Sequence, residues 1–250
     1  MNIELKKIID KSYEVFADYK IGQTLDVCTE CCVTKNEESE LAQGNVREIP
    51  FDLLYTYHTA AKPQKPNTNE FKHFAPRYLD LTANLKFVSH SAEIVLRTFG
   101  EINEWTDEET EILNSFGIEF FKQCLNTYPL PENEQIISIL VMLDKGNFGI
   151  VDKLEDWETF GNLESTLHFS DLINYGFNDK KPEKLSTAFA DNRANEIVFG
   201  WVNKEKTKQI FKETIEKTIM NPTNISDRKQ TELSWAYDRL NWKNAPQQRV

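Results

Sequence analysis

The sequence predicts an all-α fold, namely a single domain of about ten packed helices with at most one or two short strands. Apolar residues recur at steps of three and four along most of the chain, the period of a helix with one buried face. Capping boxes and glycines bound many of these stretches. The alternating and β-branched clusters typical of strands are scarce. We expect one helical domain over 1–240 and a frayed C-terminal tail over 241–250.

The first third of the chain predicts four helices. A helix over 3–19 ends before Gly22, and a connector over 21–33 follows. Thr34 and Glu37 form a capping box that opens a short acidic helix to about Gln43. A third helix starts at Pro50. After a proline-marked loop over 62–68, a fourth restarts near Asn69, and we expect Pro76 to break it because proline lacks an amide donor.

The rest of the chain continues this pattern in shorter pieces. Ser89 or Ser91 caps a helix that Gly100 closes, and Thr106 with Glu109 makes a second capping box. Asp191 and Ser226 are also expected caps. The helices expected after Gly100 cover 107–127, 132–144, 150–158, 163–174, 183–190, 192–202, 205–219 and 227–240.

Composition limits the classes of partner. The net charge of −11 disfavours nucleic acid and anionic membranes, and it suits a basic protein partner. The longest apolar run, 136–143, is too short to span a membrane. The chain opens without a basic-then-apolar leader, so its four cysteines point to a reducing compartment and a cytoplasmic location.

The segment 27–33 holds three of the four cysteines and is the strongest chemical signal. Cys28 and Cys31 have the C-x-x-C spacing, which suits a tetrahedral metal or a reducible disulfide. Cys32 is a further candidate ligand, although neighbouring residues rarely both point at one ion. His58 and His73 are the residues expected to fold back as further ligands, with zinc as the metal. The helix after the segment favours a thiolate. The alternatives are redox-active thiols and cysteines that only pack, as we expect for Cys124.

A second unusual stretch covers 70–79. Phe71, Phe74 and Tyr78 share a buried face at helical spacing. His73 and Arg77 lie four residues apart on another face, where they could bind an anion or a carboxylate. Alternatively, Arg77 pairs with a nearby acidic residue, and His73 caps a helix or bonds a carbonyl.

Three stretches together resemble a family of uncharacterised bacterial proteins that share a V-C-x-x-C-C segment and an F-x-H-F-x-P-R-x-L segment. They are 25–32, 46–50 and 70–79, and similar pieces occur at 121–125 and 186–191. The resemblance covers most of 1–200. It implies a bacterial cytoplasmic protein, and it brings no assigned activity, cofactor or catalytic residue.

Three hypotheses for function follow. No serine-nucleophile elbow, phosphate-binding loop, zinc-protease motif or EF-hand loop is present, so we favour a non-catalytic interaction protein, such as an immunity or inhibitor protein for a basic toxin. The second hypothesis is a metal- or redox-linked accessory protein that uses Cys28 and Cys31. The third is an enzyme with an unrecognised helical site, which would need a pocket holding His73, Arg77 and a carboxylate.

Overall fold

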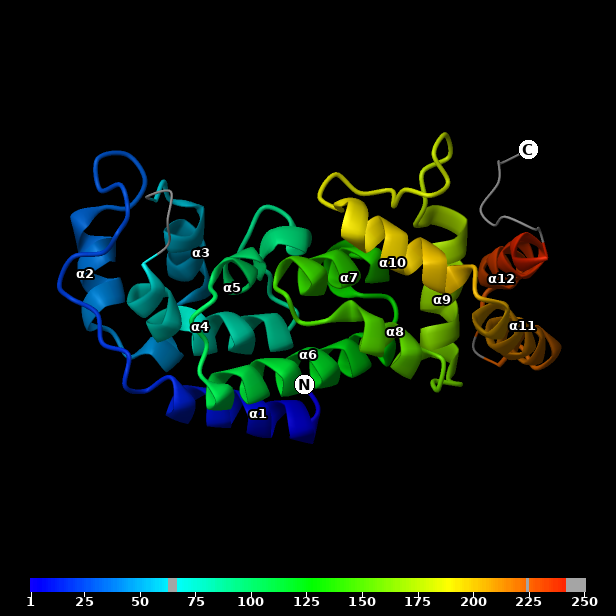
Figure 1. Cartoon of the computed structure of the whole chain (residues 1–250), viewed down its shortest axis with the longest axis horizontal. Coiled ribbons are helices and arrows are strands. Elements are labelled where there is room, and N and C mark those ends of the chain that lie inside the picture. The colour runs from blue at the N-terminus through cyan, green and yellow to red at the C-terminus, as the bar shows by residue number, and fades with distance from the viewer. Residues whose placement is uncertain (63–66, 224, 242–250) are drawn as a thin grey trace. The chain divides into compact units, whose positions relative to one another are not determined.

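Helices make up the architecture of the computed structural model, which describes residues 1–62, 67–223 and 225–241 (Figure 1). These residues contain twelve α-helices and three 3₁₀ helices. Their one antiparallel β-bridge joins Phe177 to Leu185. The predicted all-α fold is therefore confirmed. Most of the predicted loop over 62–68, and the predicted tail beyond Asn241, lie outside the described residues.

The chain divides into two compact units, and the first comprises Met1–Phe120 with Lys145–Phe148. Helices α1 and α4 of this unit lie side by side (Figure 1). Its elements are α1 (Ile3–Val15), α2 (Lys35–Gln43), η1 (Val46–Glu48), α3 (Phe51–Thr59), α4 (Thr68–Ala83), η2 (Ala92–Ile94), α5 (Arg97–Glu101) and most of α6 (Asp107–Leu125).

The second unit comprises Phe121–Asp144 and Gly149–Val250. Its core contains stacked aromatic rings. The ring centroids of Trp157 and Trp201 lie 5.4 Å apart, and those of Phe169 and Phe211 lie 3.6 Å apart. Helices α9, α11 and α12 pack against one another. No helix within the described ranges is long and apolar enough to cross a membrane. The elements are η3 (Pro131–Asn133), α7 (Ile136–Lys145), α8 (Ile150–Trp157), α9 (Leu163–Tyr175), α10 (Asn192–Val202), α11 (Glu205–Met220) and α12 (Asp227–Leu240).

Helix starts follow the predicted capping residues. The capping box at Thr34 and Glu37 is formed in both directions and opens α2. Asp191 accepts from the Ala194 amide at the start of α10, and Ser226 caps α12 in the same way. Each cap satisfies an amide that has no partner inside the helix. These local signals placed three helix starts correctly.

Helix α1 ends at Val15, four residues earlier than predicted. Phe16 is buried and packs edge-on against Trp105, with their ring centroids 6.2 Å apart. Tyr19 donates its hydroxyl to Glu109, 2.5 Å away. These tertiary contacts hold the chain after Val15 in a non-helical path that the local sequence does not encode.

The predicted break at Pro76 is wrong, because α4 runs unbroken through it. Pro76 is buried, and so are Ala75 before it and most other residues of this helix. Helix α4 packs against both α1 and η1. We infer that this burial outweighs the loss of one helical hydrogen bond.

The predicted helix over 183–190 is also wrong. Leu185 is buried and takes part in the bridge with Phe177. The Leu185 amide donates to the Asn195 side chain at 2.8 Å, and the Ser186 amide donates to the Gly176 carbonyl at 2.8 Å. Because these amides are used by distant partners, the segment forms turns instead of a helix.

The helix predicted after Ser89 or Ser91 is divided into η2 and α5, and Ser91 makes no capping hydrogen bond there. Gly100 lies inside α5 instead of ending it. A Cβ atom at Gly100 would lie 2.2 Å from the Lys145 carbonyl oxygen. Glycine is therefore required here by close backbone packing, not as a helix stop.

Candidate metal centre

Buried residues at both ends fix the cysteine segment in the first unit. Leu25 and Val33 are buried on either side of it. The Leu25 amide donates to the Glu38 carboxylate at 2.8 Å, which ties the connector to α2. The Cys28 amide donates to the Ala61 carbonyl at 2.9 Å, which ties it to the chain after α3. The segment is thus held at its ends and at its first cysteine.

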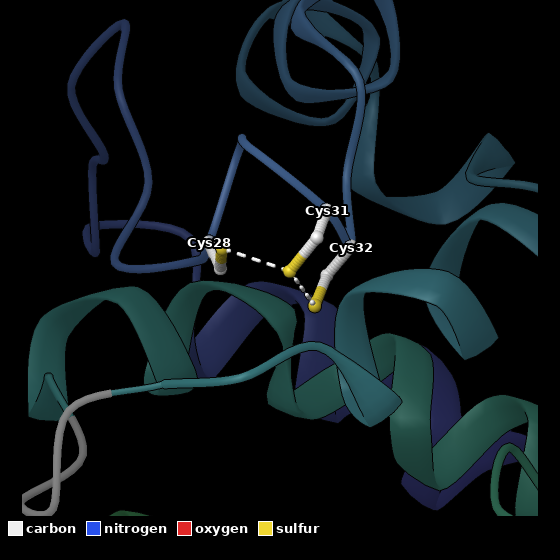
Figure 2. Close-up of side chains that lie close together, drawn as sticks. All are labelled: Cys28, Cys31 and Cys32. Carbon is white, nitrogen blue, oxygen red and sulfur yellow. Dashed lines mark hydrogen bonds between the residues drawn. The ribbon is translucent and has the colours of Figure 1, made fainter.

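One backbone turn brings the three sulfur atoms together. The Cys28 carbonyl accepts from the amides of Cys32 at 3.3 Å and Val33 at 3.1 Å. The Cys31 Sγ lies 3.3 Å from the Cys28 Sγ and 3.4 Å from the Cys32 Sγ. Figure 2 shows the three side chains turned toward one another, with the Cys31 sulfur between the other two. All three Sγ atoms lie within 4.8 Å of one another.

The three thiols are free, and they influence one another's ionisation. The Cys31 thiol and the backbone amides of Glu30 and Cys31 lower the pKa of Cys28. The neighbouring sulfurs of Cys28 and Cys32 raise the pKa of Cys31 to about 12. Cys28 is therefore the thiol that ionises most readily of these two. The groups that lower the pKa of Cys28 lie within the cysteine turn. The sequence had suggested the N-terminus of α2 instead.

The cluster can hold a metal ion. Zinc–thiolate bonds of about 2.3 Å in a tetrahedral site separate the sulfurs by about 3.8 Å. The Cys31 sulfur needs to move away from each of the other two sulfurs by only about half an ångström to reach that spacing. Cys31 is exposed and its two neighbours are half-buried, so side-chain movement meets little resistance. The prediction that Cys28, Cys31 and Cys32 form one group agrees with this arrangement.

The structure does not bring the two predicted histidine ligands into this group. His58 lies in α3, and its Nδ1 is 3.2 Å from the Tyr78 hydroxyl. His73 lies in α4, and its Nδ1 is 2.8 Å from the Tyr19 carbonyl oxygen. Among described residues, the candidate ligand group consists of the three cysteines. Both histidines are instead bonded to tyrosine residues.

Arg77 and the His73 Nδ1 have the kinds of partner that the structural alternative names. Arg77 donates to the Ile49 carbonyl at 2.9 Å and to the Asp80 carboxylate at 2.7 Å. The Asp80 carboxylate also accepts from the Tyr13 hydroxyl at 3.1 Å. The guanidinium of Arg77 therefore joins η1 to α4.

A buried ion pair on the same helix was not expected from the sequence. The Lys72 ammonium lies 2.7 Å from the Glu109 carboxylate, with the side chains 3% and 2% exposed. Lys72 also donates to the Tyr19 hydroxyl at 3.1 Å and to the Glu104 carbonyl at 2.5 Å. Since buried charges need such partners, this cluster has a structural role.

Cys124 is a core residue, as predicted, and so is His168. Cys124 is fully buried, and burial raises the pKa of its thiol. The His168 Nε2 lies 2.9 Å from the Thr127 carbonyl oxygen and 3.1 Å from that of Cys124. Burial lowers the pKa of His168. The fourth cysteine therefore sits in surroundings that suit packing, not metal binding.

Lys62 is a neighbour of the cysteine cluster that the sequence did not indicate. Burial lowers its pKa to about 8, while the nearby Glu70 and Cys32 act in the opposite direction. Lys62 directly follows Ala61, the residue whose carbonyl binds the Cys28 amide. The hydrogen bond between Cys28 and Ala61 joins residues about thirty positions apart, and no local sequence pattern predicts it.

The comparisons with known proteins do not test the resemblance that the sequence suggests. The family that the cysteine segment and the 70–79 segment resemble stays a prediction, and so does a bacterial cytoplasmic origin. No protein-family model, curated protein or solved structure matches the chain significantly.

Proposed function

We propose that the protein is a metal-binding accessory protein that holds one zinc ion through Cys28, Cys31 and Cys32. The observation that carries the proposal is that three Sγ atoms lie within 4.8 Å on one backbone turn. Thiolates are soft ligands that bind zinc strongly. The anchored turn reduces the conformational entropy that is lost when the three ligands gather around an ion.

Three cysteines leave a tetrahedral zinc ion with one further position. Structural zinc sites normally have four protein ligands, whereas sites with three keep an exchangeable position for water or a substrate. The exposure of Cys31 gives an incoming ligand access to that position. A site of this kind suits an accessory role in which zinc is received or passed on, in preference to permanent structural zinc.

Zinc titration of the reduced, chelator-free protein tests the proposal. We expect one zinc ion per chain, with release of protons as the thiols become thiolates. Replacing Cys31 by serine removes the central sulfur and should weaken binding by about 100-fold or more. Cys124→Ala is the matched control, because it removes a thiol outside the cluster and should keep full zinc binding.

Three results would refute zinc binding at this turn. They are the absence of stoichiometric zinc, equal affinity in Cys31→Ser, and loss of zinc in Cys124→Ala with the fold retained. Trapping of a Cys28–Cys31 disulfide under mild oxidants, without any zinc affinity, would favour the redox alternative. Mass spectrometry detects that outcome as a loss of two hydrogens.

A protein partner remains a second prediction for this chain. The observation that favours it is the net charge of −11, which would attract a basic partner. Whether that partner is a toxin, as an immunity or inhibitor role requires, is a separate prediction. A pull-down at low and high salt would check it, since an electrostatic complex weakens as salt increases.

A further inference from the structure

A cavity of about 310 Å³ lies in the first unit between α3, α4 and α5. This volume is at the lower end of the range for small-molecule pockets. Aromatic side chains of Tyr57, Phe71 and Tyr78 form part of its wall. Charged residues of both signs also line it, and their positions indicate which ligand would fit.

Two neighbouring acidic residues, Glu70 and Asp26, line the cavity. Glu70 is buried, and its carboxylate accepts from the Tyr57 hydroxyl at 2.7 Å and from the Asp26 amide at 2.9 Å. The Asp26 carboxylate accepts from the Asn67 side chain at 2.9 Å. The buried Glu70 carboxylate and the exposed Asp26 carboxylate both lack an ion-pair partner among the described residues, although the charge of the nearby Lys62 acts on Glu70. This pair of acidic groups favours a positively charged ligand group.

The Lys62 ammonium, which also lines the cavity, is held by other groups. It donates to the carbonyl oxygens of Tyr57 and His58 at the end of α3, and it lies 3.2 Å from that of His58. It also lies 4.2 Å from the centre of the Tyr57 ring. Lys62 therefore caps α3 and contributes positive charge at the cavity, but it forms no ion pair with Glu70.

Arg97 and Thr98 of α5 add hydrogen-bond donors to the cavity lining. The Arg97 Nε lies 3.2 Å from the Glu101 carboxylate, and the Arg97 side chain is 59% exposed. A guanidinium has five N–H groups, so its terminal nitrogens can still bind a carboxylate. Thr98, the next residue, adds a hydroxyl to the same wall.

His58 adds a neutral donor. The Tyr78 hydroxyl is buried, and its partner is the His58 Nδ1 at 3.2 Å. Because a buried hydroxyl proton needs an acceptor, we assign Tyr78 as the donor, which places the imidazole proton on Nε2. Burial lowers the pKa of His58 to about 4, in agreement with a neutral ring.

We propose that this cavity binds a small zwitterion of the free amino-acid class. The ligand carboxylate pairs with Arg97 and the His58 Nε2–H, and the ligand ammonium pairs with Asp26 and Glu70. The two carboxylates would repel a simple anion, and the positive charges of Lys62 and Arg97 would repel a simple cation. A ligand that carries both charges avoids both conflicts. This inference is independent of zinc binding at the cysteines.

Calorimetry and thermal-shift measurements with each common L-amino acid, at about 10 mM, test the proposal, because this concentration reveals millimolar affinities. γ-Aminobutyrate serves as a probe with more widely spaced charges. For each amino acid that binds, its N-acetyl derivative and its decarboxylated amine are measured in parallel. We expect at least one amino acid to bind, and each single-charge derivative to bind about tenfold or more weakly.

Two substitutions locate the binding site. Arg97→Gln and Asp26→Asn should each weaken binding by about tenfold or more. Arg47→Gln is the matched control, since Arg47 is 49% exposed and also pairs with a carboxylate, that of Asp10. It should leave the affinity unchanged. The inference is overturned if no amino acid or γ-aminobutyrate binds, if single-charge derivatives bind equally well, or if the two cavity variants keep the wild-type affinity.

Discussion

The cysteine turn and the 70–79 segment of α4 were the two candidate sites in the sequence, and they differ in one physical respect. In α4, the charged groups of Lys72 and Arg77 and the Nδ1 of His73 have partners within the unit, and only the buried His73 Nε2 among these residues has none. In the turn, the sulfurs of Cys28, Cys31 and Cys32 contact mainly one another and are partly exposed. The ability of a residue to bind a ligand therefore depends on whether the fold leaves its binding atoms available, and not on residue type alone.

The largest expected effect is a loss of folding stability when the buried ion pair of α4 is broken. Lys72→Ala leaves the Glu109 carboxylate buried without its cation, so we expect a loss of roughly 3–5 kcal/mol in the free energy of unfolding. Chemical denaturation measures this loss. Lys7→Ala is the control, because its pair with Glu4 is 68% and 63% exposed and should contribute less than about 1 kcal/mol. Similar losses in both variants would contradict a structural role for Lys72.

The buried His58 of α3 gives the second effect. Burial holds the pKa of His58 at about 4, against 6.5 for the free side chain. Between these values the unfolded chain binds more protons than the folded chain, so stability decreases as the pH falls from 6.5 toward 4. The loss from this group reaches about 3 kcal/mol at the acid end.

Comparison of His58→Gln with the wild type isolates that contribution from other titrating groups. The difference in free energy of unfolding between pH 7 and pH 4.5 should be smaller in the variant (about 1–3 kcal/mol smaller). Glutamine can still accept from the Tyr78 hydroxyl, so a general loss of packing is avoided. Parallel pH profiles would show that His58 ionises freely in the folded protein.

Zinc should stabilise the protein through the turn by a slightly smaller amount. At a free zinc concentration 100 times the dissociation constant, ligand binding adds about 2.7 kcal/mol to the free energy of unfolding. Thermal unfolding with and without zinc measures it. We expect a zinc-dependent increase of at most about 0.4 kcal/mol for Cys31→Ser, and a full increase for His58→Gln and His73→Gln. An increase that disappears in a histidine variant would restore that histidine as a ligand.

The smallest effect is on the metal-free turn. Because the Cys28 side chain is not in the core, Cys28→Ser should change the free energy of unfolding without zinc by at most about 0.5 kcal/mol. Urea denaturation with a chelator present measures this. A larger loss would indicate that the cysteines hold the turn together without metal, as the packing alternative requires.

Local signals explain which parts of the fold could be predicted. The capping residues Thr34, Asp191 and Ser226 act within three residues of a helix start, so the starts of α2, α10 and α12 were predictable. Pro76 and the 183–190 segment were not, because burial and long-range hydrogen bonds decide them. A single sequence records neither.

The candidate metal site also has a part that local sequence predicts and a part that it does not. Cys28, Cys31 and Cys32 are close in sequence, so one turn can gather them, and their grouping was predictable. His58 and His73 were expected to fold back, but the directions of their side chains depend on Tyr78 and Tyr19 from other elements. The cavity between α3, α4 and α5 combines residues from distant segments, and no pattern in the sequence indicated it.

X-ray absorption at the zinc edge of the zinc-loaded protein tests the central claim most directly, because it counts the sulfur ligands. We expect three sulfurs at about 2.3 Å and one nitrogen or oxygen ligand at about 2.0 Å, without the multiple-scattering signal of imidazole. Two or fewer sulfurs, or a histidine signal, would contradict a zinc centre built from the three cysteines of this turn.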